Sequence, residues 1–206
     1  MRNTGGCDFP SDPDASPDLQ TPFWSPSVQP QAILLSPIGH DGAEVGSLFT
    51  LAHLDGLDLR RAGDGWHGVW QIDDIAHQFW LRDAVPDAAA FYAVTLPMDS
   101  FLELRIHAAR RLWRSLTRRP PGSPLGVLPD QLRQWHILSL RALDARLRRE
   151  SYRTIAEVLL GFRGTKEDFE GDPAKNKARR LVAHGIRMMR GGYRLLLHYP
   201  IKPGKT

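Results

Sequence analysis

The chain has 206 residues, of which 42% are hydrophobic and six are tryptophan, so it can form one large domain or two small ones around a buried core. This composition excludes a chain that is disordered throughout. A single cysteine, Cys7, excludes a disulfide framework or a thiolate metal site within one chain. Since no apolar run approaches the roughly 20 residues that cross a bilayer, and the first 30 residues lack signal-peptide features, we expect a cytoplasmic protein that does not enter a membrane.

The charges are distributed unequally along the chain. Residues 1–100 contain 4 Lys and Arg against 14 Asp and Glu, a net charge of −10, whereas residues 101–206 contain 23 against 9, a net charge of +14. Basic residues also solvate ordinary helix faces, so the excess alone does not establish a nucleic-acid partner. The positions of these charges on the predicted helices must distinguish the two interpretations.

The acidic half of the chain has the pattern of a small sheet. Residues 1–30 show no hydrophobic period and are predicted to be a flexible leader, and residues 31–97 are predicted to form a small acidic β-rich domain. The predicted strands are Ala32–Leu35, Ser47–Leu51, Trp66–Ile72, His77–Leu81 and Phe91–Leu96. The predicted turns, which use the tolerance of Gly and Asp for positive φ, are His40-Asp41-Gly42, Gly63-Asp64-Gly65 and Asp73-Asp74.

The hydrophobic period changes to that of a helix near Asp99. Residues 98–119 are predicted to form a connecting amphipathic helix, which Pro120-Pro121-Gly122 ends. Its predicted apolar face consists of Leu102, Ile106, Ala109, Trp113 and Leu116.

Residues 125–199 are predicted to form a basic helical domain, followed by a tail at residues 200–206. Its first predicted helix spans about Asp130 to Arg149, with Arg141, Arg148 and Arg149 outside. The predicted inward-facing residues are Leu132, Trp135, Leu140, Leu143 and Leu147.

Two further helices follow in this domain. Ser151 caps a short helix that Gly161 ends, with Tyr152, Ile155, Ala156 and Leu159 on one face. After a polar loop, Asp172-Pro173 begins a long helix, because proline at the first helical position loses no hydrogen bond, and Gly191-Gly192 ends it. The predicted apolar face of the long helix consists of Ala178, Leu181, Val182, Gly185, Met188 and Met189.

A short helix, a turn and a longer basic helix form the order found in a helix-turn-helix, whose second helix enters the major groove. The sequence therefore predicts an α+β protein: a small antiparallel β domain followed by a helical, helix-turn-helix-like DNA-binding domain. An ordinary solvated cationic helix is the alternative, but no Asp or Glu follows Asp172, and a face meant only for solvent normally mixes signs. The candidate DNA-binding residues are Arg153, Lys175, Asn176, Lys177, Arg179, Arg180, Arg187, Arg190 and Arg194.

Four blocks of the second half also carry a resemblance to a known family: Leu140–Leu147, Ser151–Glu157, Lys175–Val182 and Met189–Arg194. They resemble the DNA-binding domain named after the type VI secretion regulator RovC, over about residues 125–197. Three shorter segments are similar to the part that often precedes this domain: Asp64-Gly65-Trp66-His67, Leu104-Arg105 and Leu112-Trp113-Arg114. The resemblance implies a transcriptional activator or antiactivator of a secretion locus or of an integrative and conjugative element. Relatives often carry a Trp-Lys pair in the loop Gly164–Gly171, where this chain has Glu167-Asp168-Phe169-Glu170.

Patterns typical of enzymes are weaker. Residues 63–68 match G-x-G-x-x-G, but a strand-like segment follows where a dinucleotide site needs a helix, so a hairpin is the better interpretation. His40, His53, His67 and His77 lack the spacing of a metal site and are expected to be surface or packing residues. Trp113 and Trp135 are expected to pack in helix cores rather than to stack on bases. We expect no catalytic residue, metal or cofactor.

Two functions follow from these observations. In the first, the chain is a transcriptional regulator that binds duplex DNA with the helix starting near residue 173, while the acidic domain mediates homo-oligomer formation or contact with a regulatory protein. In the second, the chain is an antiactivator or protein-interaction module that keeps the fold but binds a protein partner. As a further alternative, the acidic half can cover the basic half by charge attraction and keep it inactive until a partner displaces it.

Overall fold

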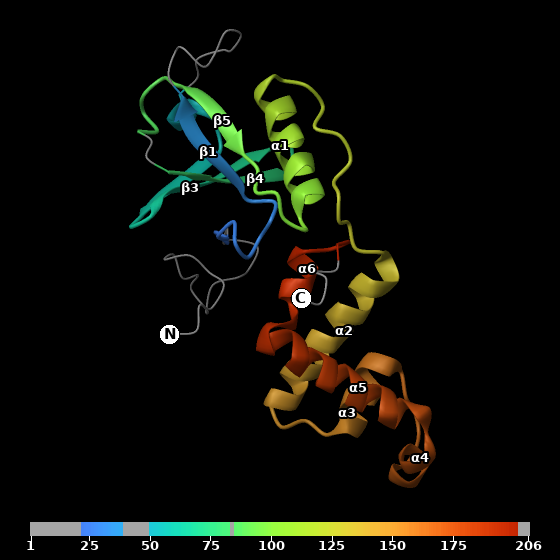
Figure 1. Cartoon of the computed structure of the whole chain (residues 1–206). Helices are drawn as coiled ribbons and strands as arrows, with labels where there is room; N and C mark the ends of the chain where they lie inside the picture. The colour runs from blue at the N-terminus through green and yellow to red at the C-terminus, as the bar shows by residue number, and fades with distance from the viewer. Residues whose placement is uncertain (1–21, 39–49, 83–84, 202–206) are drawn as a thin grey trace. The chain divides into compact units, whose positions relative to one another are not determined.

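The structure, a computed structural model, describes residues 22–38, 50–82 and 85–201. The chain divides into two compact units, the first reaching Leu125 and the second spanning Gly126–Pro200. The first unit contains a sheet and a helix of 15 residues, and the second is helical (Figure 1). Each unit has its own hydrophobic core.

A five-stranded sheet forms most of the first unit. Its strands lie in the order β2-β3-β4-β1-β5, and neighbouring strands are antiparallel except for β1 and β4, which run parallel. The predicted α+β class, with a largely antiparallel sheet followed by helices, is confirmed. The strand bounds are β1 (Ile33–Ile38), β2 (Leu57–Ala62), β3 (Gly65–Ile72), β4 (Ile75–Leu81) and β5 (Phe91–Thr95).

Two tight turns connect β2, β3 and β4. The β3–β4 turn consists of Asp73 and Asp74, whose φ angles are 46° and 59°. Positive φ at both central residues is the hairpin geometry that matches the twist of the flanking strands. The β2–β3 turn consists of Gly63 and Asp64. Both predicted hairpin turns are confirmed, and the G-x-G-x-x-G match at residues 63–68 continues into strand β3 rather than a helix.

Two parts of the sheet differ from the prediction. Strand β2 was not predicted because the adjacent charges of Arg60 and Arg61 break the hydrophobic alternation; the Arg61 guanidinium lies 5.9 Å from the Trp66 ring. The end of the predicted strand Ser47–Leu51 is instead the start of a short 3-10 helix, η3 (Leu51–His53), in which Leu51 is buried. The rest of that segment, residues 47–49, and the predicted turn at residues 40–42 lie outside the described residues.

Helix α1 (Leu102–Leu116) packs against the sheet with a different face from the predicted one. Trp113, expected in the core, is 52% exposed, and Ile106 is also exposed. The side chains that α1 buries are Leu104, Arg105, Ala108, Leu112 and Ser115.

Hydrogen bonds to two polar side chains explain this choice of face. Arg105 Nη2 donates to Asp99 Oδ2 at 2.8 Å, and Ser115 Oγ lies 2.9 Å from Nε2 of the buried His77. A polar group that keeps its hydrogen bonds is buried at little cost, whereas a hydrophobicity pattern assigns it to the surface. The pattern therefore selected the wrong one of two apolar stripes on α1.

The segment before β1 packs on the sheet. Phe23 is buried, and the Gln78 side chain of β4 accepts a hydrogen bond from the Trp24 amide at 3.3 Å and donates one to the Pro22 carbonyl at 2.8 Å. Residues 22–30, which the sequence pattern places in a flexible leader, thus contact the first unit. The remainder of that leader, residues 1–21, lies outside the described residues.

We predict that His77 makes the first unit sensitive to acid. Burial, and secondly the charge of Arg111, lower the pKa of His77 from its ordinary value of 6.5 to about 4. In the unfolded chain the imidazole takes up a proton near pH 6.5, so the folded unit loses stability as the pH falls from about 6.5 toward 4, by roughly 3 kcal/mol for the full shift. His77→Gln should reduce this loss. Urea unfolding followed by tryptophan fluorescence measures it, because Trp135 is the only tryptophan outside this unit.

The matched control for this experiment is His53→Gln, since His53 is an exposed histidine of the same unit. This variant should keep the acid sensitivity of the wild type. If His77→Gln loses stability with falling pH as steeply as the wild type does, the assignment to His77 is wrong.

The second unit is built from three main helices and three short ones. Its core contains apolar side chains from α2, α3, α4 and α5, and α5 packs against both α2 and α3. The helix bounds are α2 (Asp130–Leu147), α3 (Tyr152–Leu160), α4 (Lys166–Gly171), α5 (Pro173–Arg187), the π-helical turn η4 (Met188–Gly192) and α6 (Arg194–Leu197).

Both predicted ends of α3 and the predicted start of α5 are confirmed, whereas α5 ends at Arg187 and the turn η4 leads to the predicted end at Gly191-Gly192. Ser151 Oγ accepts a hydrogen bond from a first-turn amide of α3 at 3.0 Å, and Asp172 Oδ1 does the same for α5 at 2.6 Å, with Pro173 at its first position. These caps satisfy amides that have no partner within the helix. Gly161, with φ of 70°, ends α3 in the left-handed conformation that glycine adopts without strain.

Three predicted core residues of this unit are exposed: Leu140, Leu147 and Met189. Of the predicted inward-facing residues of α2, Leu143 is buried, and the other buried residues are Ser139 and Ala142, whose small side chains allow α5 to approach closely. Met189 lies in η4, beyond the regular part of α5, so the helical period no longer places it on the buried face.

We predict that Gly185 of α5 cannot be replaced by alanine without loss of stability. A Cβ atom at this position would lie 2.6 Å from the Ser139 carbonyl oxygen and 2.9 Å from Leu143 Cβ, so the two helices would have to separate. The expected cost is about 1–3 kcal/mol, although alanine has the higher helix propensity. Thermal unfolding followed by circular dichroism measures it. Gly171→Ala, in α4, is the control, because nothing lies within 4 Å of its Cβ position; equal stability of both variants would contradict the prediction.

Candidate nucleic-acid interface

The buried and exposed sides of α5 carry different kinds of residue. Its core side consists of Ala178, Leu181, Val182 and Gly185, all buried. At about 100° per residue, Asn176, Arg180 and Arg187 lie on the opposite side, and all three are exposed, as predicted from the helical period. The helix thus presents two guanidinium groups and an amide outward while its other side anchors it to α2 and α3.

The cations at the start of α5 differ in their surroundings. Lys175 forms an ion pair with Glu170 of α4, and these contacts lower the pKa of the Glu170 carboxyl. Lys177 is exposed, and the Arg179 guanidinium lies over the Tyr152 ring, with Cζ 5.7 Å from the ring centroid. Lys175 is therefore committed to an internal contact.

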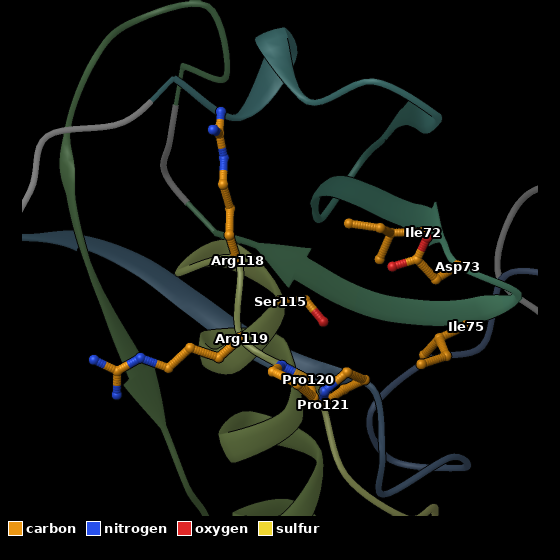
Figure 2. A pocket seen from close by; sticks show the side chains of 8 residues that line it. All are labelled: Ile72, Asp73, Ile75, Ser115, Arg118, Arg119, Pro120 and Pro121. Atoms are coloured by element: carbon orange, nitrogen blue, oxygen red, sulfur yellow. The ribbon is translucent and has the colours of Figure 1, made fainter.

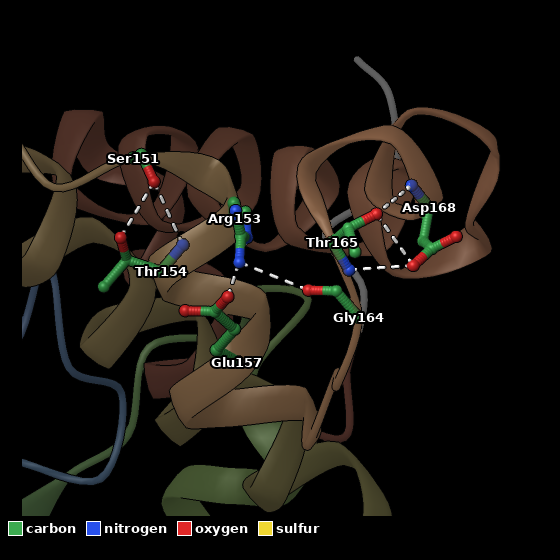
Figure 3. Close-up of polar contacts among 7 residues, drawn as sticks. All are labelled: Ser151, Arg153, Thr154, Glu157, Gly164, Thr165 and Asp168. Atoms are coloured by element: carbon green, nitrogen blue, oxygen red, sulfur yellow. Dashed lines mark hydrogen bonds and ion pairs between the residues drawn. The ribbon is translucent and has the colours of Figure 1, made fainter.

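Arg153 of α3 is likewise held within the unit. Its Nε atom donates to Glu157 Oε1 at 2.8 Å and its Nη2 atom donates to the Gly164 carbonyl at 3.2 Å (Figure 3). Beside it, Thr165 and Asp168 form a reciprocal capping box at the start of α4. The predicted polar loop therefore contains a capped helix, and Arg153 ties α3 to the residues that precede it.

Arg187 is oriented by two histidines. Arg187 Nη2 lies 2.6 Å from His184 Nδ1, and His184 Nε2 lies 3.0 Å from His136 Nδ1 of α2. A guanidinium only donates, so His184 accepts at Nδ1 and donates through Nε2 to His136. Burial, and secondly the charge of Arg187, lower the pKa of both imidazoles, which keeps them neutral near pH 7. Neither histidine was identified from the sequence as a partner of Arg187. The three-residue separation of His184 from Arg187, which places both on one side of a helix, was the signal that could have identified His184.

The last two candidate residues lie beyond α5. Arg190 is in η4 with a non-helical backbone, and Gly191, with φ of 113°, turns the chain there. Arg194 begins α6. Both side chains are exposed, but they do not continue the helical face that Asn176, Arg180 and Arg187 share.

The connection between α3 and α5 is longer than in a short-turn helix-turn-helix. It comprises residues 161–172 and includes α4, whereas the simplest form of the motif has a turn of about three or four residues. Two carboxylates on this connection, those of Asp168 and Glu170, form contacts within the unit. Thr165 lowers the pKa of the Asp168 carboxyl through backbone and side-chain hydrogen bonds, and Glu170 pairs with Lys175.

A pocket in the first unit does not gather groups suited to catalysis. It has a volume of about 610 Å³ and is lined by Ile72, Ile75 and two prolines, together with Asp73, Ser115 and two arginines. In Figure 2 the guanidinium ends of Arg118 and Arg119 extend away from Asp73. None of the predicted DNA-binding residues lines this pocket.

The pair of Ser115 and His77 has the short distance of a nucleophile and its base, but its surroundings favour packing. A pKa of about 4 makes His77 a weak base, and its charged neighbour is Arg111 rather than a carboxylate. Among the described residues, no group of three or more His, Cys, Asp or Glu side chains is placed to hold a metal ion. Within the same residues, no helix combines the length and apolarity needed to span a membrane.

A capped helix, anchored on one side and cationic on the other, in a unit of net positive charge, defines a nucleic-acid-binding helical domain. A family model described as the type VI secretion system transcription factor DNA-binding domain (RovC_DNA-bd) matches residues 95–198. The chain belongs to this family of DNA-binding transcription factors. The match begins in β5 and therefore includes α1 of the first unit as well as the second unit. No curated protein and no solved structure matches the chain significantly.

Proposed function

We propose that the chain is a transcriptional regulator that binds duplex DNA by placing the exposed side of α5 in the major groove. The observation that supports this most directly is the combination of Asn176, Arg180 and Arg187 on one exposed helix face, with the opposite face buried. Arginine forms paired hydrogen bonds with guanine edges, and asparagine does so with adenine. An anchored helix holds such side chains in a fixed register.

The flanking cations have a different role in this proposal. Lys177, Arg179, Arg190 and Arg194 neutralise backbone phosphates, which positions the helix but carries no sequence information. Lys175 holds α4 against α5 through its ion pair with Glu170. Arg153 holds the loop before α4 against α3 through its hydrogen bond to the Gly164 carbonyl. The unit then acts as a helix-turn-helix whose turn contains an additional short helix.

The setting of this activity follows from the family resemblance. We propose that the protein acts in the cytoplasm on a secretion locus or on an integrative and conjugative element, without a cofactor. The acidic first unit, with a net charge of opposite sign to the second half of the chain, mediates self-association or contact with a regulatory protein.

We predict that binding to duplex DNA depends steeply on salt. If about four to six phosphates are neutralised, log K plotted against log salt has a slope near −4 to −5. Arg180→Glu should weaken binding at least roughly tenfold without changing the fold, because the side chain points away from the core. Fluorescence anisotropy with a labelled random duplex measures both quantities. Arg141→Glu is the matched control, since Arg141 is exposed on α2, on the side turned away from α5; no binding by the wild type at low salt would overturn the proposal.

A second candidate function, a protein-interaction module, is favoured by apolar side chains on the surface of α2 and α3. Leu140, Leu147 and Val158 are all at least half exposed, and the last is 70% exposed. At about 100° per residue, Leu140 and Leu147 share one face of α2, and exposed apolar groups on one face are typical of protein contacts. Leu147→Ser should leave DNA affinity unchanged while lowering self-association in analytical ultracentrifugation. If both measurements match the wild type, this surface has no such role in self-association.

A further inference from the structure

A cationic cluster that joins the predicted residue Arg179 to two residues outside the predicted DNA-binding set, Arg146 and Tyr152, lies where α2, α3 and α5 meet. Its centre is Tyr152, the first residue of α3, whose ring is half-buried against the core. The Arg146 guanidinium of α2 lies over this ring with Cζ 5.0 Å from the centroid, and the Arg179 guanidinium of α5 lies 5.7 Å from it. Two cations from separate helices thus converge on one aromatic side chain.

Neither of these guanidinium groups forms an ion pair with a carboxylate of the described residues. Arg146 Nη1 donates to the Glu150 carbonyl oxygen at 3.0 Å, which leaves most of its five N–H groups available. The Glu170 carboxylate accepts a hydrogen bond from Lys175, which lowers the pKa of Glu170 the most. The charge of Arg179 lowers this pKa by a smaller amount. Arg146 and Arg179 therefore differ from Arg153 and Lys175, each of which forms an ion pair with a glutamate of the same unit.

Two guanidinium groups that contact one ring, with no carboxylate of the described residues paired to either, attract an anion. The ring contributes a modest attraction to each cation, about 0.5–1 kcal/mol at an exposed site, and also restricts where each guanidinium lies. The cluster therefore keeps two cations in place that form no ion pair with the carboxylates of the described residues.

The cluster adjoins the exposed side of α5. At about 100° per residue, Arg179 lies roughly 60° around the helix from Asn176. A duplex whose major groove receives Asn176 and Arg180 has a sugar-phosphate strand on either side of the helix. The side on which Arg179, Tyr152 and Arg146 lie is therefore next to one of these strands.

We propose that Arg146 and Arg179, each held against the Tyr152 ring, donate hydrogen bonds to backbone phosphates of the DNA strand that lies beside α5. The inference rests on the proposed function of α5 and extends the interface onto α2 and α3. The contact carries no base information, so it strengthens binding to every sequence by a similar factor.

The test compares the salt dependence of DNA binding for the full chain and for Arg146→Gln. Loss of one phosphate contact should make the slope of log K against log salt shallower by about 0.9, and should weaken binding roughly eightfold at 0.1 M salt. The change should be the same on a random duplex and on any preferred sequence. Tyr152→Phe, which keeps the ring, should bind like the wild type, whereas Tyr152→Leu should resemble Arg146→Gln.

The matched control is Arg141→Gln, which removes the same charge from the same helix about 140° away from Arg146 and should keep the wild-type slope. Circular dichroism shows whether each variant is folded. If Tyr152→Leu is unfolded, the salt dependence of DNA binding by Arg179→Gln is measured in its place. If the wild type binds and Arg180→Glu weakens binding, but Arg146→Gln keeps the wild-type slope, the phosphate site is refuted and the proposed function stands. If the wild type binds no DNA, the proposed function fails first.

Discussion

The close contact of α5 with α2 is the constraint on which the second unit depends. It is possible because Gly185 has no side chain where it meets Ser139 and Leu143. The contact buries one side of α5 completely, and the remaining side is exposed by necessity. Since the cations of this helix occupy that remaining side, the same packing that stabilises the unit also determines which charges face outward.

The ends and faces of α3 and α5 could be predicted because local chemistry determines them. Ser151 and Asp172 are efficient caps, Pro173 is compatible only with the start of a helix, and Gly161 is the residue best suited to a left-handed end. Each of these signals acts within a few residues along the chain. Propensity and final structure therefore agree at these positions.

The errors have a different origin: they concern contacts between residues distant in sequence. On α1, the bond of Ser115 to His77, which lie 38 residues apart, helped to make a partly polar face the buried one. Strand β2 depends on pairing with β3 and carries two adjacent arginines that no strand pattern favours. In the candidate site, the hydrogen bond between His184 and His136 joins α5 to α2 across 48 residues, and no spacing along the chain reveals it.

The direction of the hydrogen bonds between Arg187, His184 and His136 has a further consequence. Because a guanidinium has no lone pair to offer, the His184 ring is confined to one neutral tautomer, with its proton on Nε2. Nitrogen chemical shifts of this ring differ between tautomers and between charge states, so isotopic labelling of histidine turns His184 into a spectroscopic reporter. A ligand that draws Arg187 away from His184 then changes the chemical shifts of the His184 nitrogens, although the ligand does not contact that ring.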